Sequence, residues 1–167
     1  MAAAGIITED ERIELIGGEV VPMSPKGRRH EIVRSELAFH MSRQAHSNLR
    51  VAAEVQFNLT DDTYVVPDIL VYPAAHKVPD VRGPSALLVI EVADSSLTYD
   101  LGSKASLYAS HGVREYWVIN AKTLETIVHR DIKGSAYTDV GRHSVDVRLV
   151  PLLAPELGVM LGNLDLD

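Results

Sequence analysis

A nearly continuous apolar run, Ala86–Val92, limits the folds open to this chain of 167 residues, and only Glu91 interrupts it. An apolar run without alternation is typical of a strand that is buried on both faces in the centre of a sheet. A buried ionised carboxylate is costly unless a cation, a hydrogen-bond network or an open cleft accompanies it. The run therefore predicts a central strand that carries a chemically demanding residue at its end.

Other segments supply the partners of this strand. Gly17-Gly18 favours an N-terminal β-hairpin between Ile13–Ile16 and Glu19–Met23, and apolar spacing predicts a helix over Arg29–Ala45. Further expected elements are strands at 51–59 and Tyr64–Tyr72, a helix at Tyr99–Ser110 capped by Thr98, a hairpin of Glu115–Asn120 with Leu124–Arg130, and a strand pair at Ala136–Val140 and Val145–Val150. We assign no form to the apolar tail Leu152–Leu164. The order predicts an α+β (α/β) fold, a mixed β-sheet flanked by helices. Without repeats or linkers, we expect a single domain over residues 1–167.

A second carboxylate, Asp68, interrupts the expected strand Tyr64–Tyr72, directly after Pro67. A structural salt bridge would explain either carboxylate alone. On neighbouring strands, however, Asp68 and Glu91 would repel each other unless a positive charge lay between them. Because the chain has no Cys and no clustered His, hard oxygen ligands favour Mg²⁺ or Mn²⁺ over zinc.

The role of Glu54 depends on the register between strands 51–59 and 64–72. If Leu59 pairs with Tyr64, Asp68 faces Val55 on the other side of the sheet from Glu54. If the loop is one residue longer, Asp68 lies opposite Glu54 on the same face. Pro67 cannot donate to a strand ladder and indicates an edge or a bulge, which makes the second register credible.

Lys104 is the candidate cation. Asp100, Lys104 and Tyr108 recur at i, i+4 and i+8 and would form one polar stripe on the helix Tyr99–Ser110. An ordinary surface pair of Asp100 with Lys104 is the simpler interpretation. The helix begins a short loop after Glu91, however, so the ammonium could reach the two carboxylates.

The net charge of −7 is unevenly distributed. Six basic and two acidic residues between Lys26 and Arg50 give that segment +4, which leaves −11 on the rest of the chain. A basic block in an acidic chain indicates a patch that faces a polyanion, although an ordinary solvent-exposed helix face would account for the same basic residues. The absence of Cys excludes disulfides, thiolate zinc sites and cysteine nucleophiles. GxGxxG, GxxxxGK[ST] and GxSxG motifs are also missing, so dinucleotide, P-loop and α/β-hydrolase functions have no support.

A set of spaced motifs resembles the Uma2-type family named "putative restriction endonuclease", which belongs to the PD-(D/E)xK nuclease superfamily. The motifs are Arg12–Glu19, Met23-Ser24-Pro25 with His30, Val66–Val71, Ile90–Val92 with Ser95-Ser96, Asp100, Lys104, Tyr108 and Gly112–Trp117. The resemblance spans roughly Glu11 to Arg130. It implies a restriction-endonuclease-like core with an N-terminal β-hairpin.

The resemblance also implies roles for single residues. Asp68 and Glu91 would bind the catalytic metal, with the Val92 carbonyl as a third ligand. Ala93 stands where the superfamily has its lysine, and Lys104 would replace that lysine from the following helix. The first helix would supply a further acid, Glu31 or Glu36, or Glu54 would serve instead. His30, Glu31, Asp100 and Tyr108 are the supporting candidates.

The expected activity is divalent-metal-dependent hydrolysis of DNA phosphodiester bonds, with Mg²⁺ or Mn²⁺ activating a water and Lys104 stabilising the transition state. Lys26, Arg28, Arg29 and Arg34 would contact phosphates. Cleavage of both strands would favour a homodimer. No apolar run reaches the ~20 residues of a membrane helix, so we expect no membrane partner and a cytoplasmic location. The alternatives are a non-catalytic binding or assembly module that retains the fold, and hydrolysis of another phosphoester.

Overall fold

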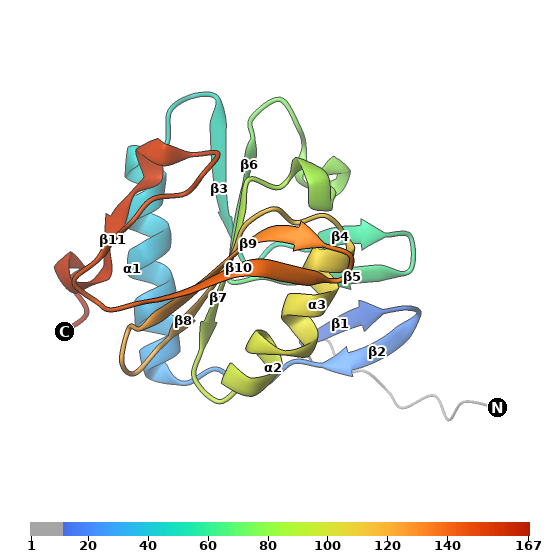
Figure 1. Cartoon of the computed structure of the whole chain (residues 1–167), viewed down its shortest axis with the longest axis horizontal. Helices are drawn as coiled ribbons and strands as arrows, with labels where there is room; N and C mark the ends of the chain where they lie inside the picture. The colour runs from blue at the N-terminus through green and yellow to red at the C-terminus, as the bar shows by residue number, and fades with distance from the viewer. Residues whose placement is uncertain (1–11) are drawn as a thin grey trace.

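The centre of the protein is a six-stranded mixed sheet, seen in a computed structural model that describes residues 12–167 (Figure 1). The strand order is β10-β9-β8-β7-β6-β3, and only β7 and β8 are parallel. The strands are β3 (Leu49–Ala53), β6 (Ile69–Pro73), β7 (Leu88–Ala93), β8 (Tyr116–Asn120), β9 (Thr126–Lys133) and β10 (Ala136–His143). The apolar run thus forms a strand in the middle of the sheet, as expected. The first 11 residues of the expected domain lie outside the described residues.

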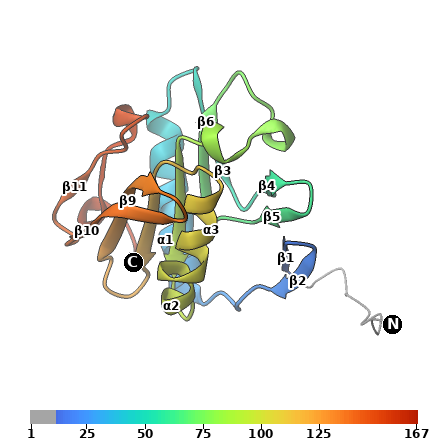
Figure 2. The same cartoon turned by 45° about the vertical axis from the view of Figure 1, so that its right-hand side comes forward.

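Helices cover both faces of this sheet (Figures 1 and 2). Helix α1 (Arg28–Gln44) packs on one face, and α2 (Leu97–Leu101) and α3 (Ser103–Ser110) make the crossover that parallel strands β7 and β8 require. Strand β7 serves both layers, because Leu88, Ile90 and Val92 join the core under α1 while Val89 and Ala93 join the core under α3. The expected mixed sheet flanked by helices is confirmed.

A second sheet of four strands carries the expected N-terminal hairpin. Its order is β2-β1-β5-β4, with β1 (Ile13–Ile16), β2 (Glu19–Pro22), β4 (Phe57–Thr60) and β5 (Thr63–Val65). Gly17 and Gly18 have φ angles of 57° and 79°, which suit a two-residue hairpin turn. Leu15 pairs with Tyr64 and joins the two hairpins, which lie side by side in Figure 2.

The prediction of one strand at 51–59 and one at Tyr64–Tyr72, the latter with an edge or bulge at Pro67, is wrong, because each is two strands. The first divides into β3 and β4 at Glu54, which has a positive φ of 53°, and the second divides into β5 and β6 around Pro67. Because both expected strands break at the same place, β3 and β6 pair in the six-stranded sheet, whereas β4 and β5 pair in the four-stranded sheet. The register is the one that places Asp68 opposite Glu54, since Ala53 pairs with Ile69 and the Glu54 N–H donates to the Asp68 carbonyl at 3.2 Å.

Two further boundaries differ from the prediction. The helix expected over Tyr99–Ser110 is two helices that meet at Gly102, and Ser96 rather than Thr98 occupies the N-cap. The strand expected at Val145–Val150 is reduced to β11 (Arg148–Leu149), which pairs with β12 (Val159–Met160), because β10 pairs with β9 instead.

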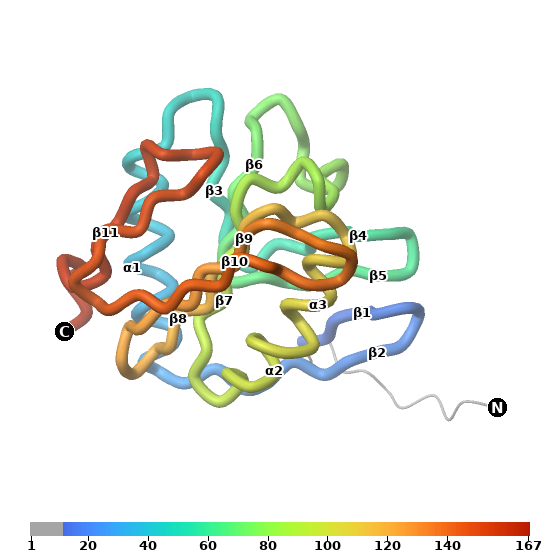
Figure 3. Tube along the Cα trace, in the orientation of Figure 1, coloured from blue at the N-terminus to red at the C-terminus, as the bar shows by residue number. Residues whose placement is uncertain are grey.

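The C-terminal tail runs back beside α1 (Figure 3). Leu157, Val159 and Leu161 are buried in the core under that helix, and Gln44 donates to the Gly158 carbonyl at 3.3 Å. The short 3-10 turns of the chain are η1 (Val78–Asp80), η2 (Gly83–Ser85), η3 (Pro155–Leu157) and η4 (Leu161–Asn163). No helix within residues 12–167 is long and apolar enough to cross a membrane.

Candidate active site

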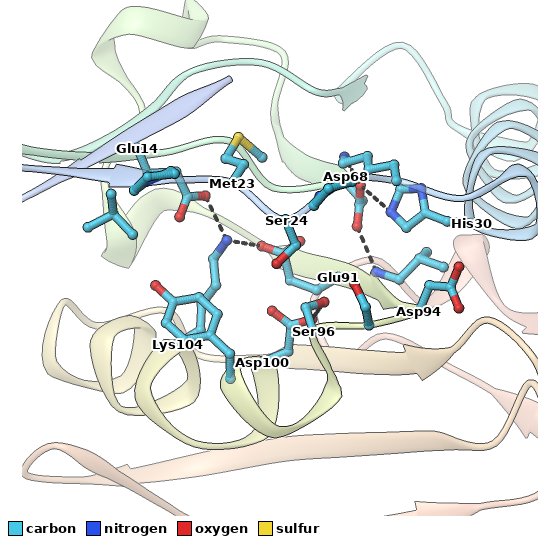
Figure 4. A pocket seen from close by; sticks show the side chains of 17 residues that line it. Glu14, Met23, Ser24, His30, Asp68, Glu91, Asp94, Ser96, Asp100 and Lys104 are labelled. Atoms are coloured by element: carbon cyan, nitrogen blue, oxygen red, sulfur yellow. Dashed lines mark hydrogen bonds and ion pairs between the residues drawn. The ribbon is translucent and has the colours of Figure 1, made fainter. Parts of the chain in front are cut away.

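A cavity of about 330 Å³ opens where the N-terminal hairpin, the start of α1, the end of β7 and the α2–α3 pair meet (Figure 4). Its charged and histidine lining residues come from these four parts and from the segment before β6, and they are Glu14, Lys26, His30, Asp68, Glu91, Asp94, Asp100 and Lys104. The structure therefore brings together Asp68, Glu91 and Lys104, the three residues that the sequence singles out first.

Asp68 directly precedes β6 and Glu91 lies in β7, and each is one residue beyond the antiparallel register pair Ile69 and Ile90. Both residues are buried, at 2% and 5% exposure. The Val92 N–H donates to Asp68 Oδ2 at 2.7 Å and fixes the carboxylate against β7. Burial alone would raise the pKa of Asp68, but a hydrogen bond from His30 and the charge of Lys26 hold it well below its usual range.

Two side chains from the segment that precedes β3 contact Asp68. Lys26 Nζ donates to Asp68 Oδ1 at 2.6 Å from the loop before α1, and His30 Nε2 lies 3.0 Å from the same oxygen. His30, an expected supporting residue, therefore does lie in the cavity. The ammonium of Lys26, a predicted phosphate contact, pairs with Asp68 in this structure.

Glu91 has a different partner set. Its Oε1 lies 2.9 Å from Lys104 Nζ and accepts a hydrogen bond from the Tyr108 hydroxyl at 2.9 Å. Burial raises the pKa of Glu91 to about 8, against the opposing charge of Lys104. Asp100, Lys104 and Tyr108 are thus all buried rather than on the surface, and the first two line the cavity. Asp100 accepts a hydrogen bond from Ser96, and burial raises its pKa to about 6.

Besides Asp94, the cavity lining holds one more charged residue that the sequence did not reveal, Glu14. It lies on β1 with 2% exposure, and its Oε1 accepts from Lys104 Nζ at 2.7 Å and from the Val66 N–H at 3.0 Å. Figure 4 shows Lys104 between Glu14 and Glu91. The one available signal was a carboxylate between the apolar residues of a hairpin strand, and nothing local indicated that the hairpin folds back onto the site.

The remaining acidic candidates lie outside the cavity lining. Glu54 is at its edge, where it shares Lys26 with Asp68 at 2.9 Å and also contacts Arg34 at 3.1 Å. Burial alone would raise the pKa of Glu54, but hydrogen bonds from Lys26 and Arg12 lower it. Glu31 pairs with Arg34 on the α1 surface. Glu36 lines a separate hollow near the C-terminal tail.

The four basic candidates differ in their surroundings. Arg28 is exposed, whereas Arg29 donates to the carbonyls of Ala121 and Leu166 and so ties α1 to the tail. Arg34 is largely covered and paired with two glutamates. Their role as phosphate contacts stays a prediction.

Comparison with known proteins identifies the family. No curated protein matches the chain. A crystal structure described as a putative nuclease belonging to DUF820 from Anabaena variabilis ATCC 29413 superimposes with a TM-score of 0.73 at 17% sequence identity, over 90% of this chain and 88% of that one. This likeness confirms the expected fold. The model of the Uma2 family, described as putative restriction endonuclease, matches residues 3–163, and the chain therefore belongs to this family.

Proposed function

We propose that this protein is a divalent-metal-dependent endonuclease that hydrolyses phosphodiester bonds of DNA. The observation that carries the proposal is the placement of Asp68, directly before β6, beside Glu91 on the neighbouring strand β7, with the Lys104 ammonium 2.9 Å from Glu91 in the same cavity. Membership of a family described as putative restriction endonuclease supports it. Two carboxylates and a lysine are the groups that metal-assisted phosphoryl chemistry uses.

The donor set fits a hard cation that keeps part of its water shell. Within residues 12–167, no three His, Asp or Glu side chains converge closely enough to hold a metal ion by themselves. Mg²⁺ does not require such a cage, because it is commonly bound by one or two carboxylates together with waters and substrate phosphate. Within the described residues, the ion pair with Lys104 and the hydrogen bond from Tyr108 both fall on Glu91 Oε1, which leaves Oε2 as a possible metal ligand. Asp68, Glu91 and the Val92 carbonyl would hold the ion.

A bound Mg²⁺ or Mn²⁺ would neutralise charge on the scissile phosphate and lower the pKa of a coordinated water. The protein residues have separate tasks. The Val92 N–H orients the Asp68 carboxylate through its 2.7 Å hydrogen bond. Burial alone would lower the pKa of Lys104, but Glu91 and Glu14 raise it, so this side chain stays a cation that can stabilise the developing phosphorane charge.

DNA would reach the cavity along the basic start of α1. Arg28 is exposed there and is the first candidate for a phosphate contact, while Lys26 is paired with Asp68 and Arg34 with Glu54. Arg29 would act indirectly, by fixing α1. A homodimer with two such sites would cut both strands, and size-exclusion chromatography with light scattering tests that arrangement.

Incubation of purified protein with supercoiled plasmid tests the proposal. We expect nicking or linearisation in Mg²⁺ or Mn²⁺, none in EDTA, and loss of at least about 100-fold in rate for Asp68→Asn or Lys104→Met. Asp139→Asn, at an exposed carboxylate on β10, is the matched control and should cleave like the wild type. Equal cleavage by Asp68→Asn, or no metal-dependent cleavage at all, would refute the proposal and favour a binding or assembly module.

A further inference from the structure

Lys26 pairs with Asp68 and with a second carboxylate at the same time. Lys26 lies in the irregular segment between β2 and α1, its side chain is 12% exposed, and it has two acidic partners. Nζ is 2.6 Å from Asp68 Oδ1 and 2.9 Å from Glu54 Oε1. The ammonium therefore bridges a buried carboxylate inside the cavity and a partly exposed one, Glu54, outside the lining.

Of the two lysines that line the cavity, Lys26 is the one in contact with Asp68. The lining holds five carboxylates and two lysines, and the second lysine, Lys104, is already held between Glu14 and Glu91. Asp68 Oδ2 accepts the Val92 N–H, so Oδ1 is the oxygen that remains for a cation. Lys26 and His30 both contact that atom.

We infer that Lys26 is an internal counter-ion that a divalent cation displaces from Asp68. The inference rests on the proposed function, because it uses the metal site formed by Asp68 and Glu91. A divalent ion at Asp68 and an ammonium on the same carboxylate would repel each other. Lysine is a point charge on a flexible stem, so Nζ can leave without moving a strand. Glu54 provides a second partner that keeps the displaced ammonium at the edge of the cavity.

This exchange predicts an increase in metal affinity when the lysine charge is removed. By isothermal titration of metal-free protein with Mn²⁺ alone, Lys26→Met should bind Mn²⁺ roughly tenfold or more tightly than the wild type, because the competing charge is gone. Lys26→Arg keeps the charge and should not gain this affinity. Lys77→Met, at an exposed lysine, is the matched control for a lost surface charge and should bind like the wild type.

The outcomes separate this inference from the proposed function. Asp68→Asn should abolish Mn²⁺ binding. If it does so, but Lys26→Met binds Mn²⁺ no more tightly than the wild type, the counter-ion role of Lys26 is refuted and the metal site stands. Weaker binding by Lys26→Met would also refute it. If neither the wild type nor Lys26→Met binds Mn²⁺, or if Asp68→Asn binds unchanged, the metal site itself fails and the exchange with it. Urea unfolding followed by Trp117 fluorescence checks that each variant is folded.

Discussion

Substitution Lys104→Met should destabilise the fold strongly, because it leaves two buried acids without their shared cation. Lys104 Nζ lies 2.7 Å from Glu14 and 2.9 Å from Glu91, and the side chains of all three residues are at most 7% exposed. Methionine has a similar length and apolar stem, so it tests the charge more than the packing.

The expected magnitude follows from the burial of the three groups. Removing one partner of a buried ion pair costs about 3–5 kcal/mol, because the other charge is left uncompensated. Protonation of Glu91, whose pKa burial already raises to about 8, relieves part of that cost near pH 7. We therefore expect a loss of about 3 kcal/mol in the free energy of unfolding. Glu14→Gln in the same chain removes one of the stranded charges and should recover about 1 kcal/mol or more of it.

Urea denaturation measures these differences with a built-in probe, since Trp117 is the one tryptophan of the chain and is fully buried in β8. Lys77→Met is the control and should stay within about 0.5 kcal/mol of the wild type. A loss below about 1 kcal/mol for Lys104→Met, or a double variant that is as unstable as the sum of its single variants, would refute the buried Glu14–Lys104–Glu91 arrangement.

Three further outcomes follow from single contacts. Burial raises the pKa of Asp100 from its ordinary value of 3.8 to about 6, so the wild type loses stability as pH rises between these values. Asp100→Asn should therefore gain up to about 3 kcal/mol over the wild type from pH 4 to pH 7 in urea titrations, and a pH-independent difference would contradict this. Gly83→Ala would place a Cβ 1.7 Å from the His111 carbonyl oxygen, and a thermal melt should show a loss of about 1–3 kcal/mol, whereas an unchanged melting temperature would contradict that contact. Arg28→Ala should lower DNA affinity in fluorescence anisotropy and reduce the slope of log K against log salt by about 1, and an unchanged slope would exclude Arg28 as a phosphate contact.

The sequence predicted those parts of the fold that local pattern determines. The central strand β7, the Gly17-Gly18 hairpin and helix α1 follow from apolar run, turn chemistry and helical spacing, and the structure confirms them. The strands at 51–59 and 64–72 were expected to be continuous, because alternation of side chains does not reveal a backbone break. The break at Glu54 requires a positive φ, which sequence patterns favour for Gly or Asn rather than Glu.

The site was predictable where a residue violates its own pattern. Asp68 and Glu91 stood out because carboxylates interrupt apolar strands, and Lys104 because its helix follows Glu91 closely. Glu14 and the inward position of Lys26 depend on how the hairpin and the loop after it pack against β7. Such long-range contacts leave no mark in a local pattern, and the same reason explains why Arg29 contacts the tail rather than solvent.

The position of a metal ion in the cavity tests the central claim most directly. A crystal of the protein soaked in Mn²⁺ should show an anomalous peak between Asp68 and Glu91, at about 2.0–2.6 Å from a carboxylate oxygen of each, as is usual for hard cations and oxygen ligands. Lys26 Nζ should no longer contact Asp68 in that crystal. An empty cavity at saturating Mn²⁺, with Lys26 still bound to Asp68, would contradict the account.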